Sequence, residues 1–442
     1  MSLDRSYQAT IDYLFGLQKH GIKLELTNSL KLMELLDNPH RQFRSVHIAG
    51  TNGKGSTAVF LASILQTAGY RVGLYTSPHL VYFSERIRIN GEPIAEHRVV
   101  ELAQRVRSVS PPTPTFFEVT TAIAFEYFAE QEVDIAVIEV GMGGRFDSTN
   151  VITPLVSVIT NIELEHQEYL GTTLELIAAE KAGIIKPGVP VVTGAGQPEV
   201  ISVIEQKAVL ARAPLYRLSR DFMPVNSKQG RPQVFDYQGM ADSYPLLRTG
   251  MLGAYQVDNA CLALAAAECL RAAGIPLDEH AVRHGIEKAH WEGRLERVSD
   301  RPDIYLDGAH NPAAAKKLAG ALREMKPAYR RTILIIGILG DKDCEGIVSE
   351  LVPLADHVVA TQARYSRAMD SGKLAAVIRG LYASVTVAET VEKAVAAARS
   401  TASSDDLILI TGSLYVAGDA RALLRPGFSD ADTASALRGL KG

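Results

Sequence analysis

The stretch from His47 to Thr57 constrains the fold of this chain most, because a glycine-rich turn there joins a strand signal to a helix signal. It reads His-Ile-Ala-Gly-Thr-Asn-Gly-Lys-Gly-Ser-Thr; an apolar run from Phe43 to Ile48 leads into it, and an amphipathic helix pattern at 57–66 follows. Glycines in such a turn let backbone N–H groups approach an anion closely. The stretch therefore predicts a phosphate-binding loop between a strand and a helix.

The spacing inside this loop is unusual. Lys54 supplies a positive charge for terminal phosphates, and the hydroxyl of Ser56 or Thr57 is placed to face a magnesium ion. In the common loop four residues separate the first glycine from the Gly-Lys pair, whereas here only two residues follow Gly50 before that pair. The loop thus indicates nucleotide phosphates but argues against the ordinary GTPase or motor pattern.

Composition narrows the class of protein. A chain of 442 residues with 47% hydrophobic and 22% charged residues is expected to be a soluble globular enzyme of two or three domains. The net charge of −4 gives no reason to expect nucleic acid as a partner. Three scattered cysteines are typical of a reducing cytosol, and no apolar run reaches the length of a membrane span. A cytoplasmic protein without nucleic acid or membrane partners is therefore expected.

Strand and helix signals alternate along the whole chain, which is the pattern of an α/β protein with parallel sheets. The expected strands are 71–76, 134–140, 155–159, 189–192, 304–306, 332–338, 357–360 and 407–410, and the expected helices are 117–128, 174–181, 259–273, 312–325 and 391–399. We predict a P-loop-containing parallel-sheet domain at 1–292 with a small β excursion at 215–250, a linker at 293–298 and a smaller Rossmann-like α/β domain at 299–442.

Polar side chains at strand ends of the first domain suggest a metal site. Glu139 closes an apolar strand, where a carboxylate is costly unless it is paired or bound to a cation. His166 follows the next strand, and open α/β sheets place ligands at the carboxyl ends of their strands. The two side chains are expected to bind one magnesium-type ion together. Two alternatives stay open: Glu139 forms an ion pair in the core, and His166 is a surface or core histidine without a metal. Lys181 has the position of an ordinary helix-end lysine, preceded by a capping pattern at Thr172.

Two turns at strand ends stand out in the second domain. A strand at 304–306 leads into Asp307 and His310, and Asn311 is a plausible N-cap before a proline at the first helical position. Another strand leads into a small-residue turn that contains Ser413.

These motifs resemble the folylpolyglutamate synthase/dihydrofolate synthase family of the Mur ligase superfamily, in order, over about residues 20–415. The matching segments are 49–56, 76–80, 85–91, 115–118, 139–150, 180–184, 293–296 and 307–312. The resemblance implies that ATP phosphorylates the carboxylate of dihydropteroate or the γ-carboxylate of a folate. The amino group of L-glutamate then attacks the acyl phosphate, so that an amide, ADP and phosphate form. It also implies a first domain of the Mur ligase central-domain type.

The resemblance assigns roles residue by residue. ATP contacts fall to Thr51, Asn52, Gly53, Lys54, Gly55, Ser56, Asn259, Arg294 and Asp307. The residues implied to bind two magnesium ions are Ser77, Glu139, His166 and Lys181, with Lys181 as a carbamate. The residues implied to bind the acid substrate or glutamate are Lys23, Leu24, Glu25, Thr115, Phe116, Phe117, Glu118, Phe146 and Ser413. The catalytic set implied is Lys54, His166, Lys181, Asp307 and His310.

The sequence departs from the family at two positions. Glu165 stands where relatives usually have aspartate, and Glu25 stands where they usually have glycine, which puts specificity for the pterin substrate in question. Two other readings are a Mur-type ligase that acts on a cell-wall nucleotide and a nucleotide-binding protein without synthesis. The sequence leaves open whether the enzyme adds the first glutamate, extends the glutamate chain, or does both. A monomer is the simplest expectation for the oligomeric state.

Overall fold

The computed structural model describes residues 3–21, 23–381 and 384–425, and the chain divides into two compact units. The first unit comprises Met1–His79, Phe83–Gly250 and Tyr255–His290. The second comprises Leu80–Tyr82, Met251–Ala254 and Trp291–Gly442. Two short segments from the earlier part of the chain therefore pack with the later part; Leu80, for example, belongs to the same apolar core as Ile304.

The first unit is built on an eight-stranded sheet in the order β4-β3-β2-β5-β1-β6-β7-β8. Its strands are β1 Arg44–Ala49, β2 Val72–Tyr75, β3 Ile87–Ile89, β4 Glu92–Pro93, β5 Ile135–Glu139, β6 Val156–Ile159, β7 Val191–Thr193 and β8 Leu215–Arg217. All pairs are parallel except those of β3 and β4, which form an antiparallel edge. The predicted parallel α/β core is confirmed.

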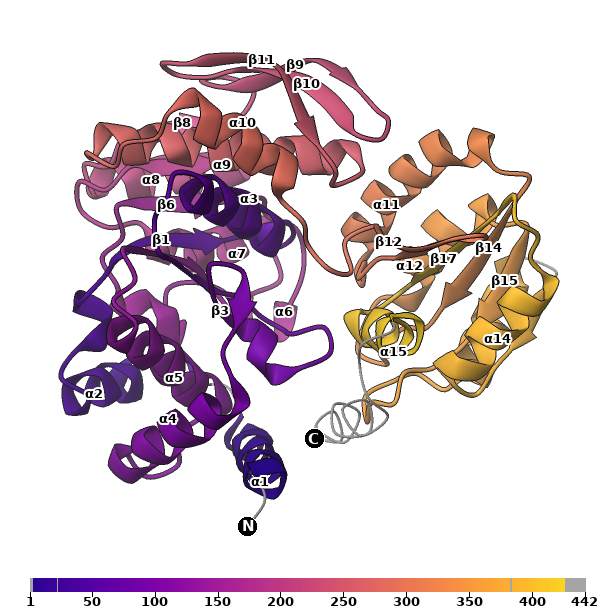
Figure 1. The fold of residues 1–442 in the computed structure, drawn as a ribbon, viewed down its shortest axis with the longest axis horizontal. Coiled ribbons are helices and arrows are strands. Elements are labelled where there is room, and N and C mark those ends of the chain that lie inside the picture. The colour runs from indigo at the N-terminus through magenta and orange to yellow at the C-terminus, as the bar shows by residue number, and fades with distance from the viewer. Residues whose placement is uncertain (1–2, 22, 382–383, 426–442) are drawn as a thin grey trace. The chain divides into compact units, whose positions relative to one another are not determined.

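Helices cover this sheet (Figure 1). They are α1 Leu3–Gly16, α2 Thr27–Leu35, α3 Lys54–Thr67, α4 Glu96–Val109, α5 Phe116–Glu130, α6 Gln167–Leu170, α7 Leu174–Lys181, α8 Pro198–Leu210, α9 Ala254–Ala272 and α10 Glu279–Lys288. Apolar side chains of α1, α2, α4 and α5 share one core with Ile138 of β5, whereas α7 and α8 share another with Ile159 of β6. Burial of these apolar faces is the main force that holds helices to sheet.

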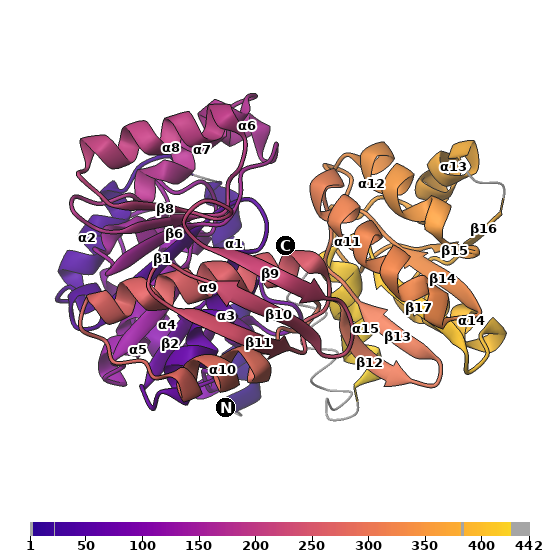
Figure 2. The ribbon, with the colours of Figure 1, turned by 90° about the horizontal axis from the view of Figure 1, so that it is seen from above.

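A separate three-stranded antiparallel sheet, in the order β11-β10-β9, belongs to the first unit. Its strands are β9 Met223–Lys228, β10 Gln233–Gln238 and β11 Ser243–Thr249, and β11 lies beside α10 (Figures 1 and 2). This sheet confirms the predicted β excursion, although β8, at its start, joins the large sheet instead.

The second unit has a six-stranded sheet in the order β12-β13-β17-β14-β15-β16. Its strands are β12 Glu296–Asp300, β13 Asp303–Leu306, β14 Arg331–Ile336, β15 His357–Ala360, β16 Val385–Val387 and β17 Asp406–Thr411. Its helices are α11 Pro312–Met325, α12 Cys344–Leu351, α13 Ser371–Leu381, α14 Val391–Thr401 and α15 Leu414–Leu424. Only β12 runs antiparallel to its neighbour, and it begins within the stretch 293–298.

Short 3-10 turns complete the fold: η1 Leu17–His20, η2 Pro39–Arg41, η3 Phe83–Arg86, η4 Ser148–Val151, η5 Ala182–Ile184, η6 Lys326–Ala328 and η7 Val352–Leu354. The N-cap predicted at Asn311 is confirmed, because its side chain accepts a hydrogen bond from the Ala314 N–H. The cap predicted at Thr172 is wrong. The helix starts at Leu174, as predicted, but its N-cap is Thr173, whose side chain accepts from the Leu176 N–H.

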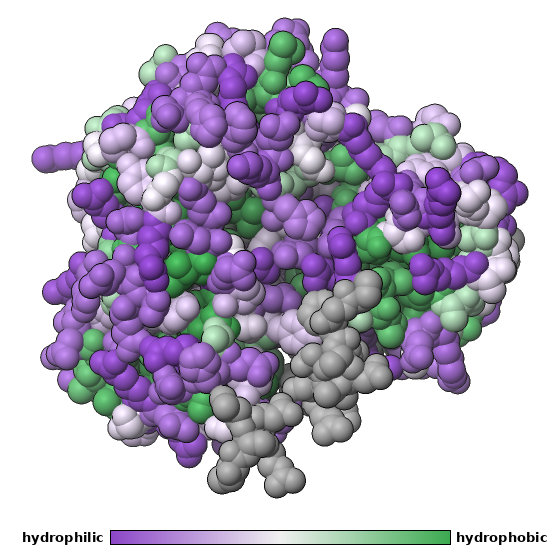
Figure 3. All heavy atoms as spheres, in the orientation of Figure 1, coloured by the Kyte–Doolittle hydropathy of each residue, from purple (hydrophilic) through white to green (hydrophobic). Residues whose placement is uncertain are grey.

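Polar side chains cover most of the face shown in Figure 3, and apolar residues form scattered groups between them. In the part of the chain that the structure describes, no helix is both long enough and apolar enough to cross a membrane.

Candidate active site

The predicted phosphate-binding loop follows β1, and the sheet register fixes what lies beside it. Ile48 pairs with Glu139 of β5, and Ala49 pairs with Ile159 of β6. The carboxyl ends of three neighbouring parallel strands therefore meet here, which is where open α/β sheets bind ligands. Glu139 lies on one side of the loop, and the segment that begins at Thr160 lies on the other.

Two glycines of the loop have backbone conformations and close neighbours that disfavour any other residue. Gly50 has a φ of 146°, and a Cβ atom on it would lie 1.9 Å from the Thr160 hydroxyl oxygen. Gly53 has a φ of 84°, and a Cβ atom on it would lie 2.4 Å from the side-chain oxygen of Asn259. The start of α3 is thus packed against α9, and Asn259, which the resemblance assigned to the nucleotide, lies beside Gly53 of the predicted phosphate-binding loop.

Replacing Gly53 by alanine tests this close packing. We expect a loss of about 1 kcal/mol in stability from the left-handed conformation, and a rise in the KM for ATP of about tenfold, because the methyl group must displace Asn259. Gly69→Ala is a matched control, since Gly69 has a φ of 91° and nothing lies within 4 Å of the position that its Cβ atom would take. Thermal unfolding and ATP kinetics of both variants give the answer; an equal KM for ATP in the two would contradict it.

Backbone and side-chain hydrogen bonds attach the loop to the segment that follows β6. The Thr51 N–H donates to the backbone carbonyl of Asn161 at 2.9 Å, and the Asn52 N–H donates to its side-chain oxygen at 2.9 Å. The Thr160 hydroxyl donates to the Asn52 carbonyl at 2.7 Å. Asn161 was not among the residues predicted from sequence; its position as a polar residue shortly after an apolar strand is the signal that would have found it.

Two lysines converge on one carbonyl oxygen of the loop. Lys54 Nζ donates to the carbonyls of Gly50 at 3.0 Å and Thr51 at 3.1 Å, and Lys181 Nζ donates to the same Gly50 oxygen at 3.0 Å. Lys181 is buried, and burial first and the charge of Lys54 second lower its pKa to about 7. Near neutral pH a large fraction of Lys181 is therefore the uncharged amine, which is the nucleophilic form.

The hydroxyl residues of the loop lie in the first turn of α3. Ser56 and Thr57 are both buried, and among the described residues the Thr57 hydroxyl oxygen has no hydrogen-bond partner. The sequence left open which of the two faces a magnesium ion, and the structure holds both at the same end of the helix.

The residues predicted to hold metal occupy strand ends around this loop. Glu139 is buried at the end of β5, where its carboxylate accepts a hydrogen bond from the Ser77 N–H at 2.9 Å. His166 has a φ of 52° and caps α6, with its carbonyl accepting from two N–H groups. Across residues 3–21, 23–381 and 384–425, no three His, Cys, Asp or Glu side chains cluster as a metal site. A buried carboxylate beside a phosphate loop still fits magnesium, which keeps waters and takes phosphate oxygens.

The N-terminal segment is tied to the start of α5. Lys23 Nζ donates to the Thr113 carbonyl at 2.8 Å, and the Asn28 side chain donates to Glu118 at 3.3 Å. Thr115 and Glu118 form a capping box, with each side chain accepting from the backbone N–H of the other. The predicted residues Thr115 and Glu118 therefore stabilise a helix start that also anchors the segment at 23–28.

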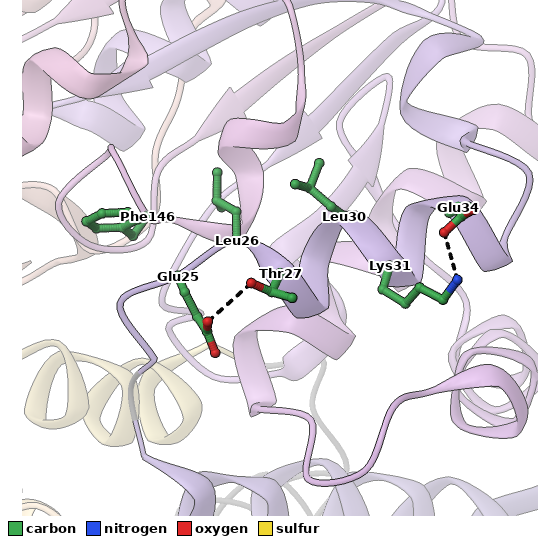
Figure 4. A pocket seen from close by; sticks show the side chains of 7 residues that line it. All are labelled: Glu25, Leu26, Thr27, Leu30, Lys31, Glu34 and Phe146. Atoms are coloured by element: carbon green, nitrogen blue, oxygen red, sulfur yellow. Dashed lines mark hydrogen bonds and ion pairs between the residues drawn. The ribbon is translucent and has the colours of Figure 1, made fainter.

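This anchored segment lines a pocket of about 600 Å³ (Figure 4). Its lining residues are Glu25, Leu26, Thr27, Leu30, Lys31, Glu34 and Phe146. Figure 4 shows the apolar side chains of Leu26, Leu30 and Phe146, with hydrogen bonds from Thr27 to Glu25 at 3.2 Å and from Lys31 to Glu34 at 2.8 Å. Such an apolar wall suits a flat aromatic group, whereas the Glu25 carboxylate disfavours an anionic group beside it. Lys23 and Leu24 do not line it.

Two predicted substrate residues pack elsewhere. Phe116 stacks on Phe15 with ring centroids 5.3 Å apart, and the guanidinium of Arg86 lies 5.2 Å from the Phe116 ring centroid. Phe117 packs against Tyr75 and closes the space beside Gly141. Neither phenylalanine lines the pocket of Figure 4.

A buried hydrogen-bond chain supports the turn that carries Phe146. The Thr149 hydroxyl donates to Asp147, whose carboxylate also accepts from the Met142 and Thr149 N–H groups. Since the hydroxyl has one proton, His47 Nε2, 2.8 Å from it, must be the donor in their hydrogen bond. Burial lowers the pKa of His47 to about 3, so this imidazole stays neutral.

His47 should make the first unit sensitive to acid. Its pKa is near 6.5 when unfolded and about 3 when folded, so the stability it contributes is complete above pH 6.5 and falls as the pH drops toward 3. We expect about 2 kcal/mol of this loss by pH 5. Thermal unfolding of the wild type and of His47→Gln between pH 5 and 8 measures it. The variant should show the shallower pH dependence, and parallel curves would contradict this.

In the second unit, Asp307 organises the turn after β13. Its carboxylate accepts from the Leu295 N–H at 2.9 Å and the Ala309 N–H at 2.8 Å. Burial raises its pKa, and the nearby charge of Arg294 opposes that rise. His310 Nδ1 lies 2.8 Å from the Gly308 carbonyl and must donate to it, because a carbonyl oxygen only accepts. Ser413 caps α15 by accepting from the Val416 N–H at 3.1 Å.

The structure thus gathers the predicted residues into groups within each unit. In the first unit, the loop, Lys181 and Asn259 form one group, Ser77 and Glu139 another, and the pocket with Glu25 and Phe146 a third. In the second unit, Asp307 and His310 share the turn after β13, the charge of Arg294 acts on Asp307, and the Asp307 N–H donates to the Ile410 carbonyl, near Ser413, at 3.0 Å.

Two family models match the chain. The Mur ligase middle domain matches residues 48–267, and the Mur ligase glutamate ligase domain matches residues 293–414. The dihydrofolate synthase/folylpolyglutamate synthase of Bacillus subtilis (strain 168) is 37% identical over 436 residues, which cover 95% of this chain and 99% of that protein.

Solved structures agree over nearly the full length. Mycobacterium tuberculosis folylpolyglutamate synthase complexed with ADP has a TM-score of 0.89 and 36% identity, and the match covers 95% of this chain and 99% of that chain. Escherichia coli FolC in complex with DHPP and ADP has a TM-score of 0.87 and 31% identity, with coverage of 94% and 97%.

Proposed function

Since this chain belongs to the folylpolyglutamate synthase/dihydrofolate synthase family of Mur ligases, we propose that its loop and pocket serve the addition of L-glutamate to dihydropteroate, to a reduced folate, or to both. The predicted family is confirmed, and the chain is an ATP-dependent ligase of folate metabolism. The residue roles below and the magnesium requirement are the proposed part.

The convergence of Lys54 and Lys181 on the Gly50 carbonyl carries this proposal. Backbone N–H groups of the loop and the Lys54 ammonium bind the ATP phosphates, and Asn259 fixes the turn they bind to. The γ-phosphoryl group moves to the carboxylate of the acid substrate, so one P–O bond forms as the bond to ADP breaks. Positioning and charge neutralisation supply most of the catalysis in such transfers.

The pocket of Figure 4 is proposed to hold the flat part of the acid substrate against Leu26, Leu30 and Phe146. The amine of L-glutamate then attacks the acyl phosphate, and the amide forms as phosphate leaves and the amine loses a proton. Arg294, Asp307 and His310 of the second unit are proposed to serve the nucleotide and this second step. Ser413 supports them by capping α15.

Glu139, His166 and Ser77 are proposed to hold magnesium together with a carbamate on Lys181. The near-neutral pKa of Lys181 supports this modification, because only an uncharged amine adds carbon dioxide. The carbamate then presents an anion where the unmodified side chain presents an amine or an ammonium group. When bound, magnesium neutralises the charge of the transferring phosphoryl group.

Phosphate release by the purified full chain tests the function. It should require ATP, magnesium, L-glutamate and a pterin acid together, with dihydropteroate and tetrahydrofolate assayed side by side. Turnover with one acceptor identifies a synthase of a single type, and turnover with both identifies a bifunctional enzyme. Glutamate incorporation without an acceptor, or no turnover with any pterin, would contradict the proposal. Turnover of a UDP-muramoyl acceptor would favour a cell-wall ligase instead.

A further inference from the structure

A cationic and aromatic cluster lies after the carboxyl ends of β15 and β17 in the second unit. Tyr365, in the loop 361–370, stacks on Tyr415 of α15 with ring centroids 4.0 Å apart and ring planes at 9°. The guanidinium carbon of Arg367 lies 5.2 Å from the Tyr365 ring centroid, and its Nε donates to the Tyr365 hydroxyl at 3.2 Å. The two rings thus form a rigid support beside one guanidinium group.

The loop that carries Arg367 is fixed by its backbone. The Arg367 carbonyl accepts from the Gly340 N–H at 2.8 Å, and the Met369 N–H donates to the Ile338 carbonyl at 2.9 Å. The Arg364 N–H donates to the carboxylate of Asp419 on α15 at 3.0 Å. The loop is therefore attached both to the segment after β14 and to α15, so Arg367 projects from a defined position.

Apart from its contacts with Tyr365, the Arg367 side chain has one weak partner. Its Nη1 lies 3.4 Å from Asp341, and the two side chains are 54% and 45% exposed, so the pair contributes little to stability. Among the described residues the structure gives Nη2 no partner. A guanidinium with open donors and a fixed aromatic support is suited to bidentate binding of a carboxylate.

We propose that Arg367 binds a carboxylate of the L-glutamate that this ligase adds, with Tyr365 and Tyr415 holding its guanidinium in place. The inference rests on the proposed function and deepens it, because it names the residue that recognises the amino acid. Three observations carry it: the place at the carboxyl edge of a parallel sheet, the fixed loop and the open donors. Asp307, His310 and Ser413 follow β13 and β17 of the same sheet.

The test compares two arginines of one loop. Arg364 matches Arg367 closely, since it also pairs with a carboxylate, that of Glu392, at 3.4 Å and is 47% exposed. In Arg367→Gln we expect the KM for L-glutamate to rise by about 10- to 100-fold, as for loss of a charge-assisted contact, with the kcat at saturating glutamate and the KM values for ATP and the pterin acid nearly unchanged. Arg367→Lys should recover part of the loss, and Arg364→Gln should behave as the wild type.

Each other result overturns the inference. An unchanged KM for L-glutamate in Arg367→Gln means that the arginine does not contact the amino acid. A lower kcat together with similar rises in the KM values of all three substrates means that the loop has a structural role only. The same conclusion follows if Arg364→Gln shows the same effect as Arg367→Gln. Circular dichroism and thermal unfolding of each variant verify that it is folded.

A second readout separates this inference from the proposed function. Saturation-transfer NMR detects L-glutamate on the wild-type protein with ADP and magnesium and requires no pterin acceptor. A signal in the wild type that Arg367→Gln loses supports the inference even if no pterin is turned over. Equal signals in the two proteins, or none in either, overturn it, whereas wild-type turnover with a pterin acid tests the function independently.

Discussion

Replacing Lys54 by alanine should lower turnover by on the order of 10³-fold while leaving the fold intact. Lys54 is the only lysine within the loop 50–56, and its Nζ contacts two loop carbonyls at 3.0 Å and 3.1 Å. Its charge is needed when negative charge builds up on the transferring phosphoryl group, so its loss falls on kcat. Steady-state phosphate release at saturating ATP measures the effect.

Lys288→Ala is the control for Lys54→Ala, because Lys288 is an exposed lysine at the end of α10 in the same unit. It should keep wild-type turnover. Circular dichroism should show the same helix content for both variants. Near-normal turnover of Lys54→Ala would mean that the loop does not bind the reacting phosphates.

Replacing Lys181 by alanine should lower turnover by about 10²- to 10³-fold, because the variant loses the group proposed to act as a carbamate beside the loop. A short carboxylic acid such as acetate should restore part of the activity by supplying the missing anion. The modification itself is visible by ¹³C NMR: wild-type protein in ¹³C-bicarbonate should show a carbamate carbonyl signal that Lys181→Ala lacks.

Lys186→Ala is the matched control for Lys181→Ala. Lys186 lies five residues on, is partly buried, and donates to the Asn150 carbonyl at 2.9 Å; burial also lowers its pKa. Its removal should cost some stability but keep turnover and the carbamate signal. Full activity in Lys181→Ala would mean that Lys181 is not part of the site. If the variant loses activity, acetate does not restore it and the wild type shows no carbamate signal, Lys181 has a positioning role instead.

Local patterns in the sequence were sufficient for the central strands of both large sheets, for several of the helices and for most of the loop. Strands end where apolar runs meet glycine or polar residues, and helices α7 and α11 have the predicted bounds because their propensity and capping signals are local. The one-residue error at Thr172 shows the limit: two adjacent threonines offer the same cap, and packing chooses between them.

The sequence by itself determined the α/β architecture, the phosphate-binding loop and the family, because these depend on short-range order and on motifs in sequence. Only the tertiary structure decided that Lys181 donates a hydrogen bond to the Gly50 carbonyl, 131 residues away in the chain. It also decided that burial lowers the pKa of Lys181 to about 7. It also decided that Phe116 and Phe117 pack away from the pocket and that Tyr365 and Tyr415 support Arg367. Desolvation and long-range packing arise from neighbours distant in sequence, so no local pattern records them.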